Sequence, residues 1–289
     1  MDAGSILTAA SAMAGLGIIL SLILALANKK LYVFEDPRID EVDELLPQAN
    51  CGACGYPGCR AFSEALVEGK TAPAKCTVGS PESIDQIATL LGVDAGGADK
   101  RIAYLACAGG SNVARQRASY DGVKTCQAAN LVAGGGKGCT WGCLGLADCE
   151  RVCDFDAIHM DENSLPVVDA EKCTACGDCV EICPKALFSI QPMSYKLWVA
   201  CKNLMANEAA EDECEVACTG CGRCAIDAPE GVINMIDNLA VINYNMNEKT
   251  NINIIQRCPT GAIVWRDKKG DVKGQNAKKI IRKSAIPLG

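Results

Sequence analysis

The sequence predicts an α+β protein in which one N-terminal transmembrane helix precedes small domains of short helices and strands. Three observations support this prediction. Residues 3–28 carry no charged side chain, twenty cysteines fall largely into closely spaced runs, and the chain has only four Phe, six Tyr and three Trp. So few aromatic side chains cannot fill large cores. We therefore expect bound metal to help hold the domains together, because metal-binding free energy becomes folding free energy.

The uncharged N-terminal segment predicts a membrane anchor. As a helix, residues 6–27 would extend about 33 Å, which is enough to cross a hydrocarbon core of about 30 Å. Residues 25–27 (Ala-Leu-Ala) resemble a signal-peptide cleavage site, but Asp2 stands where a signal peptide carries basic residues. Lys29 and Lys30 follow the segment and predict that its C-terminal side faces the cytoplasm. We expect an uncleaved, single-pass anchor in the inner (cytoplasmic) membrane.

Charge and composition exclude several classes of function. The formal charge of −7 argues against nucleic acid as a partner. With His159 as the single histidine, Cys2His2 zinc fingers and two-histidine Rieske centres are excluded. No glycine pattern of a nucleotide-binding or dinucleotide-binding loop is present, and residues 134–138 lack the required spacing. We expect no catalytic residue and no flavin site in this chain.

The first cysteine run is compact and rich in glycine. It reads Cys51-x2-Cys54-x4-Cys59-x16-Cys76, with glycines between the first three thiols that permit the tight turns needed to direct several thiolates at one centre. A reducing cytoplasm disfavours disulfides. Zinc is the alternative metal for these four thiolates, but zinc sites favour two CxxC pairs. The run therefore favours a [4Fe–4S] cluster.

Two further runs predict a two-cluster ferredoxin-like domain. The run Cys173-x2-Cys176-x2-Cys179-x3-Cys183-Pro184 has the spacing of bacterial ferredoxins, in which the fourth cysteine ligates the other cluster. Its expected partner is the looser run Cys139-x3-Cys143-x5-Cys149-x3-Cys153. We expect one cluster on Cys139, Cys143, Cys149 and Cys183. We expect the other on Cys173, Cys176, Cys179 and Cys153.

The fourth group is a ferredoxin pattern that has lost one cluster. Cys218, Cys221 and Cys224 begin a regular run, and Cys258 closes a second half-motif before Pro259. At ferredoxin spacing the missing ligand positions are Ala228, Glu248, Asn251 and Ile254. The four lost positions form one complete ligand set and the four retained cysteines form the other. This pattern predicts a single [4Fe–4S] cluster.

Four cysteines remain outside these runs: Cys107, Cys126, Cys201 and Cys214. Cys107 and Cys201 end two similar segments, IAYLAC and LWVAC, which both have the composition of strands. Residues 101–265 therefore resemble two related units. The four thiols are interpreted as buried side chains, since cysteine behaves as a small hydrophobe. A fifth cluster across the two units is the alternative, and zinc or a disulfide is a further one.

The expected organisation places these features in order along the chain. It comprises a transmembrane anchor (1–28), a linker (29–46), a small [4Fe–4S] domain (47–80), a linker containing a helix (81–100), a two-cluster ferredoxin-like domain (101–200), a single-cluster ferredoxin-like domain (201–265) and a basic tail (266–289). The tail is expected to be disordered or to contact a membrane or a partner.

These segments together resemble a known family. The anchor, followed by LLPQANCGACGYPGCRAFSEAL, GCTWGCLGLADCERVCDFDAI and CTACGDCVEICP, is similar to the B subunits of the Rnf complex, the ion-translocating ferredoxin:NAD oxidoreductase. The likeness runs from residue 1 to about residue 265. Two features depart from it. Asp154 follows Cys153 where many members have proline, and the last ferredoxin-like unit has lost one cluster.

The resemblance implies a function in electron transfer. Soluble reduced ferredoxin would deliver electrons to the clusters, which would pass them to other membrane subunits and, through a flavin-bearing subunit, to NAD. Three other functions compete. A corrinoid-linked methyl-transfer protein has a similar first domain but needs a large cobalamin domain, for which no room remains. A zinc-binding scaffold would be colourless, and a hydrogenase or dehydrogenase electron-transfer subunit would share the ferredoxin-like runs.

Overall fold

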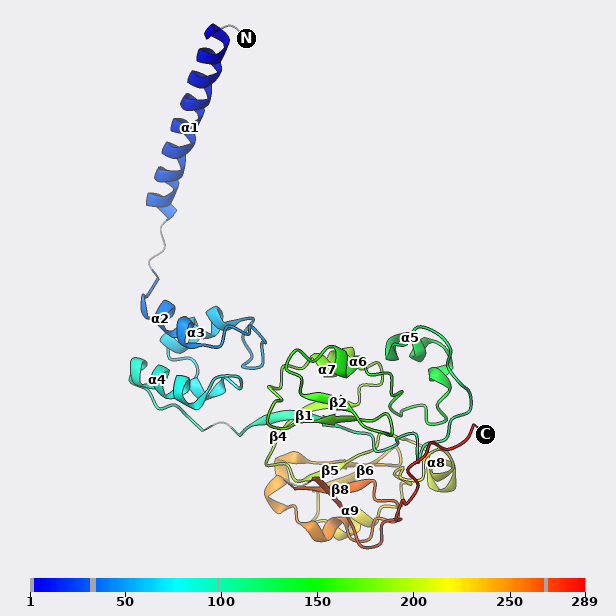
Figure 1. The fold of residues 1–289 in the computed structure, drawn as a ribbon. Helices are drawn as coiled ribbons and strands as arrows, with labels where there is room; N and C mark the ends of the chain where they lie inside the picture. The colour runs from blue at the N-terminus through cyan, green and yellow to red at the C-terminus, as the bar shows by residue number, and fades with distance from the viewer. Residues whose placement is uncertain (1–2, 32–34, 98, 268–269, 289) are drawn as a thin grey trace.

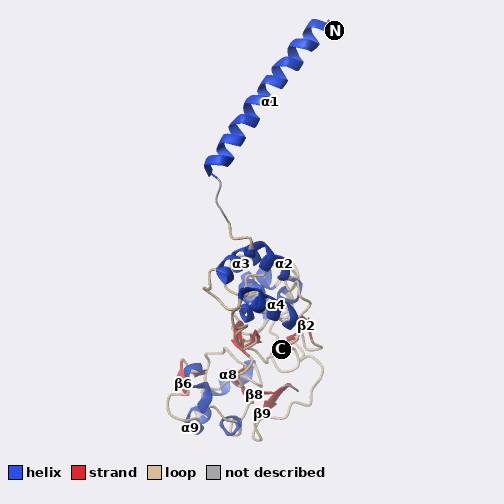
Figure 2. Cartoon of the chain, turned by 90° about the vertical axis from the view of Figure 1, so that its left-hand side faces the viewer, coloured by secondary structure: helices blue, strands red, loops and turns tan. Residues whose placement is uncertain are grey.

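The computed structural model describes residues 3–31, 35–97, 99–267 and 270–288. A long helix, α1 (Ala3–Leu31), stands apart from a small helical domain and from a larger region of short strands and helices (Figure 1). Figure 2 shows that loops make up much of the larger region. This mixture of short helices and strands behind one long apolar helix confirms the predicted α+β fold class.

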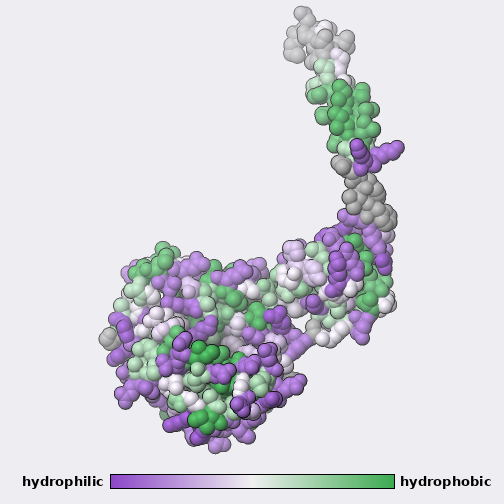
Figure 3. Space-filling view, turned by 180° about the vertical axis from the view of Figure 1, so that it is seen from behind, coloured by the Kyte–Doolittle hydropathy of each residue, from purple (hydrophilic) through white to green (hydrophobic). Residues whose placement is uncertain are grey.

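Helix α1 has the properties of a membrane-crossing helix. Its 21-residue stretch Ala10–Lys30 is long and apolar enough to cross a membrane. The large side chains on it are exposed, Leu24 to 68% and Ile18 to 66%, whereas a soluble domain would bury most of them. Figure 3 shows these side chains as one apolar band. Lys29 and Lys30 lie in the last turn.

The small domain packs its helices around an aliphatic and aromatic core. Its elements are α2 (Arg38–Leu45), α3 (Cys59–Val67), the 3₁₀ turn η1 (Pro73–Lys75) and α4 (Pro81–Leu91). Val42, Phe62 and Ile87, one from each α-helix, are at most 1% exposed. Ser80 caps α4 by accepting the Ser83 N–H at 3.2 Å. Helix α4 falls in the segment expected as a linker, yet through Ile87 it belongs to this core.

The larger region consists of two units with the same strand pairing. We call residues 101–192 the first unit and residues 197–273 the second unit. Each has a short hairpin and an antiparallel pair that joins its beginning to its end. In the first unit these are β2 (Ile158–Met160) with β3 (Pro166–Val168), and β1 (Arg101–Leu105) with β4 (Phe188–Pro192). In the second they are β6 (Ile233–Ile236) with β7 (Leu239–Ile242), and β5 (Leu197–Val199) with β8 (Ile263–Asp267), which also pairs with β9 (Gly270–Lys273).

The segments before Cys107 and Cys201 are the strands β1 and β5, as the sequence predicts. The boundary between the units differs slightly from the expected one. Strand β5 precedes residue 201 but pairs with β8, with Trp198 opposite Val264. Residues 197–199 therefore belong to the second unit, because long-range pairing rather than sequence order decides membership.

The helices of the two units are short and several carry cysteines. They are α5 (Cys126–Leu131), η2 (Ala133–Gly136), α6 (Asp148–Arg151), α7 (Asp178–Ile182), α8 (Asn207–Glu213), α9 (Arg223–Asp227), η3 (Tyr244–Lys249) and η4 (Ile252–Ile255). Helices α6, α7 and α9 each follow a left-handed residue, namely Ala147 (φ 63°), Gly177 (φ 103°) and Gly222 (φ 71°). This reversal turns the chain sharply, so that cysteines before and inside the helix face one point.

The two units pack directly against each other. The Trp198 indole N–H donates to the carbonyl of Leu105 at 2.9 Å, and the Ala108 N–H donates to Ala200 O at 3.0 Å. The Tyr104 and Trp198 rings lie 5.2 Å apart. The guanidinium of Arg266 lies 4.1 Å from the centre of the Tyr104 ring. Hydrogen bonds and buried aromatic rings thus hold the units in one relative position.

The basic C-terminal segment runs along both units (Figure 1). Arg282 forms an ion pair of 3.0 Å with Glu215, and Lys278 pairs with Glu211 of α8 at 3.4 Å. The Ile286 N–H donates to Ser111 O of the first unit at 2.9 Å. The expected disordered tail is therefore a segment with contacts inside the chain, because acidic groups of the second unit attract its basic side chains.

Candidate cluster-binding sites

All twenty cysteines lie in the described part of the chain, and all are free thiols. Sixteen of them line four cavities in sets of four, and three of the remaining four contribute to the raised pKa of the fourth, Cys179. Every cysteine thus belongs to one set of four, and one thiolate per iron atom is the ligand set of a [4Fe–4S] cluster.

The first set lies in the small domain. Cys51, Cys54, Cys59 and Cys76 line a cavity with about 320 Å³ of empty volume. The turn that carries them requires left-handed backbone at Gly52 (φ 69°) and Gly55 (φ 89°). Asn50 closes the turn, since its Oδ1 accepts the Cys59 N–H at 2.8 Å. Burial raises the pKa of Cys76, and the backbone N–H groups of two following residues partly oppose that rise.

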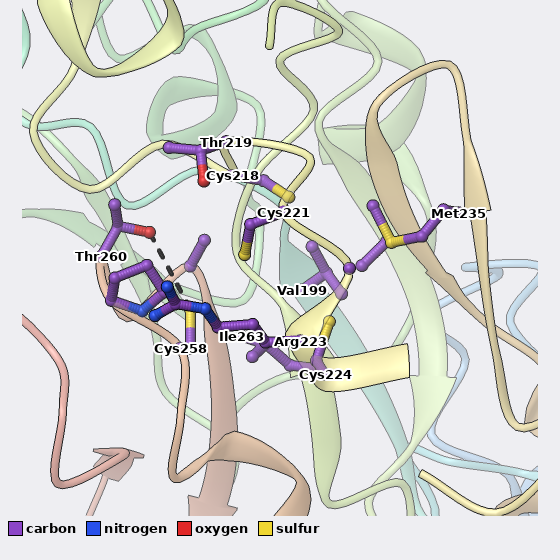
Figure 4. A pocket seen from close by; sticks show the side chains of 14 residues that line it. Val199, Cys218, Thr219, Cys221, Arg223, Cys224, Met235, Cys258, Thr260 and Ile263 are labelled. Carbon is purple, nitrogen blue, oxygen red and sulfur yellow. Dashed lines mark hydrogen bonds between the residues drawn. The ribbon is translucent and has the colours of Figure 1, made fainter. Parts of the chain in front are cut away.

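The set in the second unit surrounds the cavity drawn in Figure 4. Cys218, Cys221, Cys224 and Cys258 line it, and the empty volume is about 360 Å³. Val199, Met235 and Ile263 supply apolar lining. The Thr260 hydroxyl lies 3.9 Å from the Cys258 sulfur, as the dashed line shows.

Two of the four positions at which the second unit lacks cysteines contribute to its core, whereas Glu248 and Asn251 are exposed. Ile254 is fully buried and Ala228 is partly buried in a cluster of apolar residues that includes Val232 and Ile255. Apolar packing therefore occupies this part of the unit.

Cys153, Cys173, Cys176 and Cys179 form the set predicted from the ferredoxin-like runs. Burial raises the pKa of Cys179 to about 12, and the neighbouring thiols Cys173, Cys176 and Cys153 contribute to that rise. Two backbone groups donate to sulfur in this set: Ala103 N–H to Cys173 Sγ and Ala157 N–H to Cys153 Sγ, both at 3.4 Å. The structure thus brings together a cysteine of one run with three of the other.

The companion set differs from the predicted one at a single position. Cys143, Cys149 and Cys183 line a cavity with about 340 Å³ of empty volume, and the fourth cysteine there is Cys126. Cys139, which the sequence placed in this set, lines a different cavity. The reason is local: the chain turns between the two residues, with the Gly142 N–H donating to Cys139 O at 3.1 Å. Cys139 and Cys143 therefore face different cavities.

Cys126 could not be recognised from spacing, because it lies outside the compact run. It is the first residue of helix α5, which Thr125 caps by accepting the Ala128 N–H at 3.2 Å. The Gln127 N–H donates to the buried carboxylate of Asp148 at 3.1 Å. This contact fastens the start of α5 to helix α6, beside Cys149. The irregular spacing of the run at 139–153 was the one signal in the sequence that pointed to such a difference.

The remaining cavity lies between the two units and has about 320 Å³ of empty volume. Cys107 and Cys139 of the first unit and Cys201 and Cys214 of the second unit line it. Three of these were expected as separate buried thiols. Packing of the two units brings them together, with Ala114 of the first unit opposite Cys214 in an antiparallel bridge.

Burial disfavours the charged form of five of the cysteine thiols. It raises the pKa to about 12 for Cys143, Cys149, Cys179, Cys201 and Cys224. A buried thiolate is therefore unfavourable without a nearby cation. Bound iron would supply that charge, since metal binding removes the thiol proton.

A single metal ion requires a tighter grouping of ligands. Among the residues that the structure describes, no three Cys, His, Asp or Glu side chains are grouped closely enough for one ion. A [4Fe–4S] cluster has a different requirement, because each thiolate binds its own iron atom. Sets of four cysteines around a cavity fit this requirement.

Two families match parts of the chain. A family described as "Putative Fe-S cluster" matches residues 46–78, which hold the first set of cysteines. A family described as "4Fe-4S binding domain" matches residues 165–188, which include the regular ferredoxin-like run.

Relatives match almost the whole chain. The B subunit of the Na(+)-translocating ferredoxin:NAD(+) oxidoreductase complex of Acetobacterium woodii is 38% identical over 92% of this chain and 78% of its own length. The B subunit of an ion-translocating oxidoreductase complex of Methanosarcina acetivorans is 37% identical over 80% of this chain and 88% of its own length. The B subunit of the proton-translocating ferredoxin:NAD(+) oxidoreductase complex of Clostridium ljungdahlii is 36% identical over 86% of this chain and 88% of its own length.

Proposed function

Since this chain belongs to the family of B subunits of ion-translocating oxidoreductase complexes, we propose that it relays electrons from reduced ferredoxin to the membrane partners of such a complex. The observation that carries this proposal is the sorting of all twenty cysteines into sets of four. When bound, each [4Fe–4S] cluster supplies a one-electron carrier, so an electron moves between neighbours without any bond forming or breaking.

We assign four clusters to the sets outside the interface between the units. Their ligands are Cys51, Cys54, Cys59 and Cys76; Cys126, Cys143, Cys149 and Cys183; Cys153, Cys173, Cys176 and Cys179; and Cys218, Cys221, Cys224 and Cys258. This assignment replaces Cys139 by Cys126 in the second set. The zinc alternative lacks comparable support, because the two matching families are described as Fe–S and 4Fe–4S families.

Contacts between neighbouring sets support a serial relay. The Thr77 hydroxyl, one residue after Cys76, donates to Thr174 O at 2.5 Å. Thr174 lies between Cys173 and Cys176, so this contact joins the small domain to the first unit beside a ligand of each set. Within the first unit, Cys149 and Cys179 lie in one buried core although they belong to different sets. These contacts place segments that carry ligands of neighbouring sets next to each other, as a serial relay requires.

Backbone N–H groups tune the carriers. Donors to ligand sulfur include Leu187 N–H to Cys183 Sγ at 3.5 Å and the contacts to Cys153 and Cys173 described above. Hydrogen bonds to cluster sulfur and solvent exposure are two of the factors that set the reduction potential. The small domain lies between the anchor and the first unit (Figure 1). We propose that its cluster is the one nearest the membrane partners.

The anchor would hold the relay at the membrane. Lys29 and Lys30 end helix α1, and basic residues flank membrane helices on the cytoplasmic side. We infer that the clusters face the cytoplasm, where soluble ferredoxin is present, and that ion translocation and the flavin belong to other subunits. A reporter enzyme fused after residue 30 tests the orientation. Activity confined to the cytoplasm is expected, and periplasmic activity would reverse the assignment.

Reduction by ferredoxin tests the donor. The full chain, purified anaerobically in detergent, is mixed with reduced ferredoxin while the visible absorbance of the clusters is followed. We expect the visible absorbance of the clusters to fall after mixing with reduced ferredoxin. Dithionite is the control, because it reduces accessible clusters without a protein donor. If dithionite bleaches the protein and ferredoxin does not, ferredoxin is not the donor. A purified chain that contains zinc and no iron would end the relay proposal.

A further inference from the structure

The cavity between the two units has the features of a cluster site. We propose that Cys107, Cys139, Cys201 and Cys214 bind a fifth [4Fe–4S] cluster, that this cluster transfers electrons between the units, and that Lys137 raises its reduction potential. The proposal rests on the cluster binding proposed above and goes beyond it. Two ligands come from each unit, so the site exists only when the units are packed together.

Backbone hydrogen bonds fix the four thiols from both sides. The Ala108 N–H, next to Cys107, donates to Ala200 O, next to Cys201, at 3.0 Å. The Arg115 N–H donates to the carbonyl of Glu213 at 2.9 Å, and the Gly138 N–H donates to Arg115 O at 2.9 Å. Residue 115 thus joins the backbone beside Cys214 to the backbone beside Cys139. These contacts hold the ligand-bearing segments of the two units against one another.

Two glycines keep space for the thiols. A Cβ on Gly109 would lie 3.0 Å from Cys214 Sγ and 3.7 Å from Cys107 Sγ. A Cβ on Gly138, beside Cys139, would collide with the Glu213 carboxylate. Glu213 is 6% exposed and forms an ion pair with Arg117. Any larger residue at either glycine would therefore push ligand-bearing segments apart.

A positive charge is fixed at the wall of this cavity. Lys137 lines it, and its Nζ donates to Gly109 O and to Cys143 O, both at 2.6 Å. The lysine stem runs against Gly142, where a Cβ would lie 3.0 Å from Cε. Reduction adds negative charge to a cluster. A nearby cation stabilises the reduced form and raises the potential.

A buried side-chain amide lacks a partner at the same cavity. Asn203 lines the cavity and is 1% exposed. Its Oδ1 accepts the Met205 N–H at 2.9 Å, whereas its Nδ2 has no hydrogen-bond partner. An unsatisfied buried donor is costly. Asn203 Nδ2 would thus be free to donate to a group bound in the cavity.

The proposed site contacts a ligand residue of the neighbouring set on each side. The Cys143 N–H donates to Cys107 Sγ at 3.4 Å, and Cys143 belongs to the set in the first unit. The Cys218 N–H donates to Cys201 Sγ at 3.3 Å, and Cys218 belongs to the set in the second unit. The cavity therefore lies between the two sets and connects them through one hydrogen bond to each. One electron would pass from set to set through this site.

Iron and sulfide analysis of the anaerobic full chain tests the ligand set. Five clusters predict about 20 irons per chain, four in each [4Fe–4S] centre, and the variants Cys107→Ser and Cys214→Ser predict about 16. Val113→Ala is the matched control, because Val113 is 4% exposed in the same interface core but is not a ligand. That control should keep about 20 irons.

The wild-type count decides the question even if both serine variants fail to fold. About 16 irons in a protein that ferredoxin still reduces would overturn the fifth cluster and leave the relay intact. About 16 irons with one zinc would assign the interface site to zinc and overturn the proposal in the same way. A chain without iron would end both proposals.

Redox titration followed by electron paramagnetic resonance tests the role of Lys137. Lys137→Met should lower the midpoint potential of the signal that Cys107→Ser removes, and Lys137→Arg should restore it. Lys202→Met is the matched control, because Lys202 lines the same cavity but its side chain is exposed, so solvent screens its charge. The midpoint potential should shift less in Lys202→Met than in Lys137→Met. Equal potentials in wild type and Lys137→Met would overturn the role of Lys137.

Discussion

The two units of the larger region share strand pairing but differ in what fills their interiors. The first unit holds two sets of cysteines of its own, and cysteines such as Cys149, Cys173 and Cys179 are part of its buried core. The second unit holds one set, and Val232, Ile254 and Ile255 are fully buried in its core. Aliphatic side chains thus form much of the interior of the second unit, whereas thiols take a larger share of the interior of the first. The first unit should then depend on iron more strongly than the second.

Removal of iron should give the largest effect. Anaerobic chelation should abolish hydrogen-exchange protection of β1 and β4 in the first unit, because buried thiols without iron leave its core incomplete. Strands β6 and β7 in the second unit should keep more protection, since aliphatic packing supports them. Hydrogen exchange with mass spectrometry gives both results on one sample. Equal loss of hydrogen-exchange protection in the two units would contradict the expected stronger dependence of the first unit on iron.

Substitution of single cysteines sharpens the description of the first unit. Cys126→Ser and Cys139→Ser should each remove about four irons, one cluster, but from different clusters, because the two thiols line different cavities. Electron paramagnetic resonance distinguishes the signals that are lost. Loss of the same signal in both variants would restore the grouping based on spacing.

Shortening the Ile254 side chain tests the aliphatic core of the second unit. Ile254→Ala should destabilise that unit by about 2–5 kcal/mol, the usual cost of removing a buried isoleucine side chain. Ile252→Ala is the matched control, since Ile252 is 41% exposed, and its cost should be within about 0.5 kcal/mol. Hydrogen exchange of β6 and β7 under native conditions measures both. Similar effects of the two variants would show that Ile254 does not support the core.

Loss of one hydroxyl should give the smallest effect. Thr260→Val removes the hydroxyl that lies 3.9 Å from Cys258 Sγ. One hydrogen bond contributes about 1 kcal/mol, so the potential of this cluster should fall by roughly 40 mV for one electron. Redox titration measures the shift, and the signals of the first unit serve as internal controls. An unchanged potential would mean that this hydroxyl does not interact with the cluster ligand.

Local patterns in the sequence were sufficient for the features that depend on short spacing. The uncharged run before Lys29 predicts helix α1, because helix length and side-chain polarity decide whether a segment can enter a bilayer. The run from Cys173 to Cys179 predicts three thiols at one centre, and the structure has a tight turn inside this run, at Gly177 (φ 103°). The loss of cysteine at Ala228 and Ile254 predicts a single set in the second unit, and both side chains pack in its core.

Which distant segments share a site depends on how the whole chain packs. Cys126 joins Cys143 and Cys149 because helix α5 is fastened to α6 through Asp148. Cys139 lies with Cys214 because the two units pack together through backbone hydrogen bonds. Helix α4 belongs to the small domain because Ile87 packs into the buried core of that domain. Spacing fixes geometry over a single turn of the chain, whereas long-range contacts depend on the packing of every element between them.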